Sequence, residues 1–127
     1  LLKPTRIYVR PVRRVLGHYT VKSVVHGIAH ITGGGLVENL ERIVPDERQV
    51  VIQRGSWPVP PVFSWLQRLG EIDEAEMDRV LNMGIGMVLV VSPFYAESIR
   101  HKQAQCGVES WPIGCVQEGP RGVVWNE

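Results

Sequence analysis

Three consecutive glycines, Gly33-Gly34-Gly35, constrain this chain more than any other feature, because they separate two different periodicities. An apolar run, Val24 to Ile31, leads into them and predicts a strand over residues 24–32. After them, apolar residues recur with helical spacing, at Leu36, Leu40, Ile43 and Val44. We therefore expect a strand, a tight turn and an amphipathic helix, in that order.

Such a turn can bind an anion, because backbone without Cβ atoms lets a phosphate approach its N–H groups closely. His30 and Thr32 share one side of the predicted strand, and Asn39 lies in the first turn of the helix. However, no Lys-Ser or Lys-Thr follows the glycines, and their spacing is not G-x-G-x-x-G. The residues leave two interpretations open: a phosphate- or nucleotide-like site, or a connection that only needs positive φ.

Composition is that of an ordinary globular domain. The chain has 127 residues, of which 44% are hydrophobic and 21% charged, which suits one domain with a single core. A net charge of +1 gives no reason to expect nucleic acid or a membrane as partner. No apolar run has membrane-spanning length, and no secretory signal is present. Because the first residue, Leu1, is not methionine, we expect a fragment or a processed product.

The remaining pattern alternates helices and strands. Further helices are expected over residues 5–19, 62–70, 74–82 and 93–105. Because proline fits only near a first turn, the first of these helices either starts near Pro11 or is kinked there. Further strands are expected over residues 49–53, 88–91, 110–116 and 123–125, with residues 117–122 joining the last two as a hairpin loop. This order predicts an α+β fold in which helices pack on a mixed β-sheet.

Four local expectations accompany these elements. The continuous apolar run of the first strand suggests burial on both of its faces. In the helix over residues 62–70 the expected buried stripe is Val62, Trp65, Leu66 and Leu69, and Gly70 is its expected C-cap. Trp57 is expected to fill the core, with stacking on a base or sugar as the alternative. Asp73 and Glu76 have capping-box spacing, whereas Asp46 and Asp78 are expected as caps or solvated carboxylates.

A complete catalytic apparatus is not evident in the sequence. There is no G-x-S-x-G motif, and the four histidines have no metal-ligand spacing. Cys106 and Cys115 also lack such spacing, and we expect them to be free thiols in a reducing cytoplasm. Phosphoryl chemistry needs cation clamps as well as positioned donors, and only the donors are visible here.

Several stretches coincide, in order and spacing, with a known family. They are Pro4-Thr5-Arg6-Ile7-Tyr8-Val9, Ala29-His30-Ile31-Thr32-Gly33-Gly34-Gly35, Glu38-Asn39, Trp57-Pro58, Trp65-Leu66, Glu76-Met77, Asn82-Met83-Gly84-Ile85-Gly86-Met87 and Trp111-Pro112-Ile113-Gly114. Together they resemble the C-terminal domain of the aminoimidazole ribonucleotide synthetases, also called phosphoribosylformylglycinamidine cyclo-ligases. The resemblance covers essentially the whole chain, residues 1–127.

The resemblance implies an enzyme of purine biosynthesis that uses ATP and Mg²⁺ to close the imidazole ring of formylglycinamidine ribonucleotide. ATP would activate the formyl oxygen, and a substrate nitrogen would then attack that carbon. Members of the family are cytoplasmic homodimers of two-domain subunits. Their N-terminal domain supplies the dimer core and most ATP and metal contacts, and their C-terminal domain is α+β with partial ferredoxin-like topology.

Carried onto this chain, the resemblance marks His30 as a catalytic candidate, acting as an acid, a base or a donor to phosphate. The expected substrate- or phosphate-binding residues are Thr32, Gly33, Gly34, Gly35 and Asn39, with Thr5 and Arg6 as weaker candidates. No metal ligand is expected here, because the acidic ligands and the ATP-binding lysine belong to the N-terminal domain. We therefore expect this chain to be inactive by itself.

Two alternatives remain beside this interpretation. The chain could be a stand-alone phosphate- or nucleotide-binding domain, or a scaffold. It could also belong to a related two-domain enzyme that uses ATP, such as selenophosphate synthetase, thiamine-phosphate kinase or a hydrogenase-maturation protein.

Overall fold

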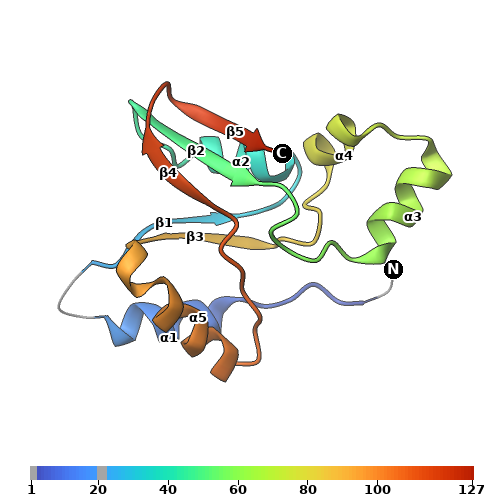
Figure 1. Cartoon of the computed structure of the whole chain (residues 1–127). Coiled ribbons are helices and arrows are strands. Elements are labelled where there is room, and N and C mark those ends of the chain that lie inside the picture. Colours follow the sequence, from blue (N-terminus) through green and yellow to red (C-terminus); the bar gives the residue numbers. More distant parts are fainter. Residues whose placement is uncertain (1–2, 20–22) are drawn as a thin grey trace. The chain divides into compact units, whose positions relative to one another are not determined.

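The computed structural model describes residues 3–19 and 23–127 and contains both helices and strands (Figure 1). Its helices are α1 Val9–His18, α2 Gly35–Glu41, α3 Pro61–Gly70, α4 Glu74–Val80 and α5 Ala96–Gln105, with a 3-10 turn at Pro93–Tyr95. Its strands are β1 Val25–His30, β2 Arg48–Gln53, β3 Met87–Val91, β4 Gly114–Glu118 and β5 Gly122–Asn126. The expected α+β class is confirmed.

The described chain forms two compact units. The first comprises Ala29–Val88 and Ile113–Glu127, and the second comprises the described residues up to Ile28 together with Leu89–Pro112. Strands β1 and β3 each pass from one unit to the other. Ile31 N donates to Gly86 O and Ser92 N donates to Val24 O, both at 2.9 Å, so these two strands run in opposite directions.

The sheet of the first unit has the order β4-β2-β5, with β2 in the centre (Figure 1). Strand β2 is antiparallel to β4 and parallel to β5. The expected hairpin between the last two strands is therefore wrong. Their connection instead crosses over β2, because the apolar β2, with Val50 and Ile52 buried, takes the central place and pairs on both edges.

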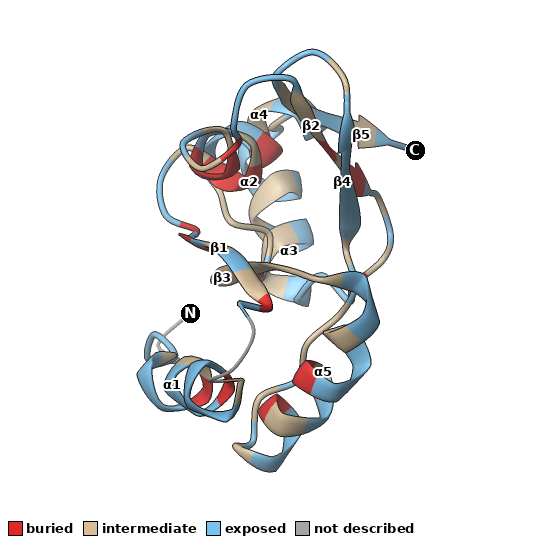
Figure 2. Ribbon diagram, turned by 90° about the vertical axis from the view of Figure 1, so that its left-hand side faces the viewer, coloured by how far each residue is buried: buried red, intermediate tan, exposed pale blue. Residues whose placement is uncertain are grey.

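The core of the first unit lies between this sheet and α2. Leu36 and Leu40, which lie four residues apart on α2, are each only 1% exposed, and Figure 2 shows the buried side of this helix. Trp57 is also buried, and its Nε1 donates to Met83 O at 3.1 Å. The interpretation of Trp57 as a core residue is thus confirmed, with its polar atom satisfied as burial requires.

The second unit has its own small core, formed by Val15 of α1, Val24 and Ile99 of α5. Burial along β1 alternates, with His26, Ile28 and His30 exposed. The expectation that both faces of this strand are buried is therefore wrong. An apolar run alone does not show whether a second layer covers the strand.

The buried stripe expected on α3 is also wrong. No residue of α3 is buried, and Trp65 and Leu69 are 43% and 66% exposed (Figure 2). Periodicity gives a helix an apolar side, but it does not provide the surface that covers it. The C-cap also differs: Gly70 is the last helical residue, and Glu71 adopts the left-handed conformation at φ 50°.

Two boundaries moved because of prolines. Helix α1 begins at Val9, four residues after the start of the longer expected helix, which places Pro11 in its first turn where no N–H is needed. Of the two alternatives for Pro11, the start of the helix near this residue is confirmed. Strand β4 begins at Gly114, after Pro112, because proline cannot donate to a sheet ladder.

The N-cap of α4 matches its sequence signature. Asp73 lies at the N-cap, and its Oδ1 accepts a hydrogen bond from Glu76 N at 2.8 Å. Replacing Asp73 by Ala should lower the free energy of unfolding by about 1 kcal/mol, because a helix N–H loses its acceptor. Urea denaturation checks this, with Asp46→Ala as control, since the Asp46 side chain is 97% exposed. Equal effects of the two substitutions would contradict the cap.

Candidate functional site

The three glycines form the expected turn between β1 and α2. Gly34 is the N-cap of α2 at φ 99° and Gly35 begins the helix at φ 64°, both in the left-handed region. Gly35 N donates to Thr32 O at 3.1 Å, which closes the turn. In the described part of the chain, no hydrogen bond is found from the N–H groups of Gly33 and Gly34.

Asn39 holds the turn from inside. It is 3% exposed, and its Nδ2 donates to Gly35 O at 2.7 Å, Thr32 O at 3.3 Å and Gly33 O at 3.4 Å. Its Oδ1 accepts from Arg42 Nη1 at 3.3 Å. The side-chain amide of Asn39 is thus committed to the turn's own carbonyl groups. This contact fixes the backbone of the turn and leaves little of the amide for a ligand.

At Gly35 the turn packs directly against the backbone of α4, because glycine has no side chain to separate them. A Cβ at Gly35 would lie less than 3.0 Å from the carbonyl oxygen of Asp78, a backbone atom that cannot rotate away. Glycine is required here both by this contact and by the left-handed φ. The structural interpretation of the triplet therefore holds for Gly35.

Gly33 differs from its neighbours. Its φ is not left-handed, and an added Cβ would meet no atom of the described chain within 4 Å. It is exposed, as are Thr32 and His30. Neither backbone strain nor close packing explains a glycine at this position. Thr32, Gly33 and His30 thus make up the open side of the turn, which a ligand could approach.

The Gly34 side of the turn is acidic. Gly34 lines a hollow of about 450 Å³ together with Glu38, Glu74, Asp78 and Glu127, and with Arg54 and Arg79. The four carboxylates outnumber the two guanidinium groups, so this hollow repels phosphate. An anion would approach the turn from Gly33 instead.

Arg54 connects most of the groups around this hollow. Its Nη2 donates to Asp78 Oδ2 at 2.9 Å, its Nη1 lies 3.3 Å from Glu74 Oε1, and the guanidinium carbon lies 4.2 Å from the centre of the Trp125 ring. Its Nε lies 2.7 Å from Glu127 Oε2, an ion pair without hydrogen-bond geometry. The hydrogen bond to Asp78 raises the pKa of Arg54 above its usual value, so Arg54 stays charged at physiological pH.

Asp78 was expected to be a cap or a solvated carboxylate, and this is wrong. It is 8% exposed and lies within α4. Arg54 was not singled out from the sequence at all. The two residues are separated by 24 positions, and no local pattern links them. Only the folded chain brings them together.

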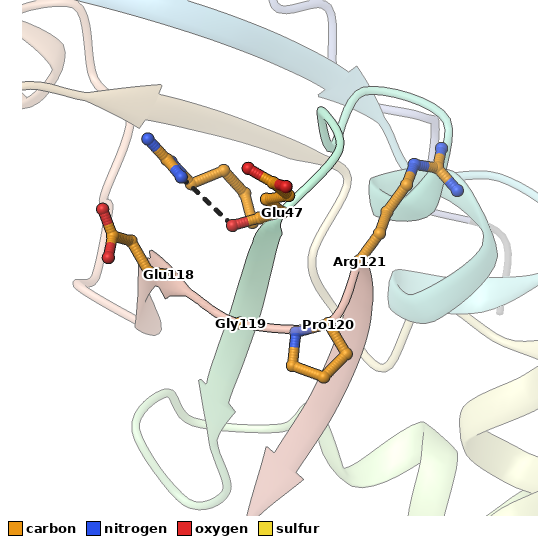
Figure 3. A pocket seen from close by; sticks show the side chains of 6 residues that line it. Glu47, Glu118, Gly119, Pro120 and Arg121 are labelled. Carbon is orange, nitrogen blue, oxygen red and sulfur yellow. Dashed lines mark hydrogen bonds between the residues drawn. The ribbon is translucent and has the colours of Figure 1, made fainter.

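A second hollow, of about 540 Å³, lies where β2 begins and the β4–β5 connection passes (Figure 3). Its lining residues are Glu47, Arg48, Glu118, Gly119, Pro120 and Arg121. Arg121 is directed toward α2, where it donates to Val44 O at 2.9 Å and Glu41 O at 2.7 Å. Its charge thus caps the C-terminal end of α2, and none of the residues expected in the site lies here.

Thr5 and Arg6 belong to the second unit. Thr5 is exposed, and Arg6 Nη1 donates to Gly107 O at 3.3 Å. Their role in the site remains a prediction.

The described residues contain no group of three or more His, Cys, Asp or Glu side chains arranged to hold a metal ion. Cys106 and Cys115 are both free thiols. None of the described helices has the length and apolar character needed to cross a membrane.

Comparison with known proteins identifies the family. The family model of the AIR synthase related protein, C-terminal domain, matches residues 1–126. The chain belongs to this family.

Relatives with curated names support the same family. The chain is 47% identical to a phosphoribosylformylglycinamidine cyclo-ligase of Syntrophus aciditrophicus, covering 93% of this chain and 33% of the relative. It is 48% identical to that of Brevibacillus brevis, covering 99% and 35%, and 50% identical to that of Geobacillus thermodenitrificans, covering 94% and 33%. The chain therefore spans about a third of the length of these relatives.

Solved structures show the same fold. A crystal structure of Escherichia coli HypE has a TM-score of 0.69 with 19% identity, covering 94% of this chain and 35% of that chain. A second HypE structure, described as a hydrogenase maturation protein, has the same TM-score and identity. At this identity the likeness concerns the fold alone.

The glycines of the turn should differ in their effects on stability. Gly35→Ala should lower the free energy of unfolding by at least about 2 kcal/mol, because it adds a left-handed alanine and a clash with backbone. Gly33→Ala should change it by less than about 1 kcal/mol, since alanine fits there. Thermal unfolding of both variants checks this, and equal losses would contradict the assigned difference.

Proposed function

We propose that this chain is the C-terminal part of a phosphoribosylformylglycinamidine cyclo-ligase, which closes the imidazole ring of formylglycinamidine ribonucleotide with ATP. One observation carries the proposal: identity of 47–50% to enzymes of that name across at least 93% of this chain. The rest of each relative's length corresponds to protein outside this chain, which we take to be an N-terminal domain. The HypE likeness gives a hydrogenase-maturation role no comparable support, because only the fold is shared.

Within that enzyme, we assign the glycine turn to binding a phosphate-bearing reactant. The N–H groups of Gly33 and Gly34 make no hydrogen bond within the described chain, and Gly33 lies on the side away from the carboxylates. The exposed residues Thr32 and His30 lie beside Gly33, and Thr32 Oγ1 donates to Asn39 Oδ1 at 3.5 Å. Thr5 and Arg6 remain weaker candidates for the same ligand. Asn39 and Gly35 take part indirectly, because they hold the turn in shape. A preformed set of donors stabilises negative charge without reorganisation during the reaction.

The described residues of this chain do not by themselves form a site for Mg²⁺ or a complete site for ATP. They contain no group suited to a metal ion, and the hollow beside Gly34 has an excess of carboxylates. We therefore assign both groups mainly to the part of the enzyme outside this chain. To the residues of this chain we assign binding and orientation, and to His30 the donation of a hydrogen bond or the transfer of a proton at the reacting oxygen. A cytoplasmic homodimer is part of the same proposal.

The decisive variant is Gly33→Ala in the full-length protein that carries this chain. Because alanine fits there but its methyl group stands on the open side of the turn, ring closure should lose about tenfold or more in kcat/KM. Phosphate release from ATP in the presence of formylglycinamidine ribonucleotide measures this.

Gly17→Ala is the matched control, because an added Cβ at Gly17 would also meet no described atom within 4 Å. Unchanged kinetics of Gly33→Ala, with the control equally active, would refute the assignment of the turn. Absence of ring closure in the unmodified full-length protein would refute the proposed enzyme.

The 127-residue chain by itself should show no ring closure, because it lacks the proposed N-terminal part of the cleft. Incubating the purified chain with ATP, Mg²⁺ and formylglycinamidine ribonucleotide tests this. The positive control is the full-length protein under the same conditions. Turnover by the chain alone would contradict the assignment of ATP to the missing part.

A further inference from the structure

The buried carboxylate of Asp78 is the least expected charge in the first unit. The Asp78 side chain is 9% exposed, and burying a carboxylate is unfavourable unless it is paired and hydrogen-bonded. Its partner is Arg54, which directly follows β2 and donates to it at 2.9 Å. Such a pair adds little net stability compared with apolar residues of similar volume. Its contribution is to fix relative positions, because the N–H donors of the planar guanidinium point in fixed directions and so restrict where a partner can lie.

Arg54 is itself fixed to the end of the three-stranded sheet. Its backbone N donates to Asn126 O at 2.9 Å, and its guanidinium lies over the ring of Trp125, both on β5. Contacts with β5 thus hold both the backbone and the guanidinium of Arg54. Through the ion pair with Asp78 the sheet holds α4 at one position.

The backbone of Asp78 in turn supports the glycine turn. Its carbonyl oxygen lies so close to Gly35 that a Cβ there would be less than 3.0 Å away. The same residue thus faces Arg54 with its side chain and Gly35 with its main chain. A shift of α4 would remove the contact between Gly35 and the Asp78 carbonyl, leaving the hydrogen bonds of Asn39 and the bond from Gly35 N to Thr32 O to hold the turn.

We propose that the ion pair between Arg54 and Asp78 positions the glycine turn for ligand binding. It fixes α4 against the sheet, so that the Asp78 carbonyl sets the place of Gly35 and of the N–H groups before it. Arg54 and Asp78 are positioning residues and contact no reactant. The inference rests on the proposed function, because the turn is the proposed binding element.

The test uses the full-length protein with Asp78→Asn and, as a second variant, Arg54→Lys. Asparagine keeps the shape of Asp78 without its charge, and lysine keeps the charge of Arg54 without its planar fork. Glu74→Gln is the matched control, because Glu74 contacts the same guanidinium at 3.3 Å from a side chain that is 66% exposed. An exposed ion pair of this kind contributes little.

Two readouts are compared at a temperature well below unfolding. Hydrogen–deuterium exchange of the peptide covering residues 31–40 should be faster in both variants and unchanged in the control. Steady-state kinetics should show a change of about tenfold in the same constant that Gly33→Ala changes. That change is either a lower kcat or a higher KM for one reactant. A general loss of stability would not select that constant.

The outcomes separate this inference from the proposed function. If Gly33→Ala impairs the enzyme but Asp78→Asn and Arg54→Lys change neither exchange nor kinetics, the positioning role is wrong and the binding role of the turn stands. If Gly33→Ala has no effect, the binding role is wrong, and the positioning role for ligand binding falls with it. If Asp78→Asn does not fold, Arg54→Lys decides by the same criteria.

Discussion

The contact between Gly35 and the backbone of α4 is the constraint on which the first unit depends. It brings a main-chain carbonyl against a main-chain Cα, an approach that any side chain would prevent. Two short helices of seven residues each thereby pack closely enough to share one core with the central sheet. Asn39 completes the arrangement from the other side by binding three carbonyl groups of the same turn. The turn is therefore held by contacts on both of its sides.

The two sides of this turn differ in charge. On the Gly34 side lies a hollow with an excess of carboxylates, and on the Gly33 side the backbone is exposed. Under the proposed function, a phosphate group would be repelled from the first side and would reach N–H donors on the second. The excess of negative charge is tolerated because Arg54 pairs with the one carboxylate that is buried, while Glu74 and Glu127 remain in solvent. Structure and electrostatics thus favour the same route of approach.

The comparisons separate fold from function. HypE shares this architecture at 19% identity, which shows that the fold tolerates extensive change of sequence. The cyclo-ligases share the sequence itself at 47–50% identity over nearly the whole chain. A fold can carry many chemistries, so the proposed function rests on the second comparison and on the open side of the turn. The chain covers about a third of those enzymes, which is why the proposed reaction needs residues outside it.

The sequence by itself determined the elements whose causes are local. The turn at the glycines, the cap at Asp73, the burial of Leu36 and Leu40 and the α+β class all follow from backbone conformation, capping and periodicity. The family also followed, because motifs spread along the whole chain are specific in combination. The assignment of ligand-facing residues remains a prediction, although the structure adds that Gly33 has no packing reason to be glycine.

Only the tertiary structure decided what depends on partners distant in sequence. The central place of β2 turned an expected hairpin into a crossover, since strand pairing is chosen by the whole sheet. The exposed side of α3 and the alternating burial of β1 depend on what covers them, which periodicity does not specify. The pairing of Arg54 with Asp78 arose in the same way. Both residues look like ordinary surface charges until the chain folds, because burial and proximity are properties of the packed molecule.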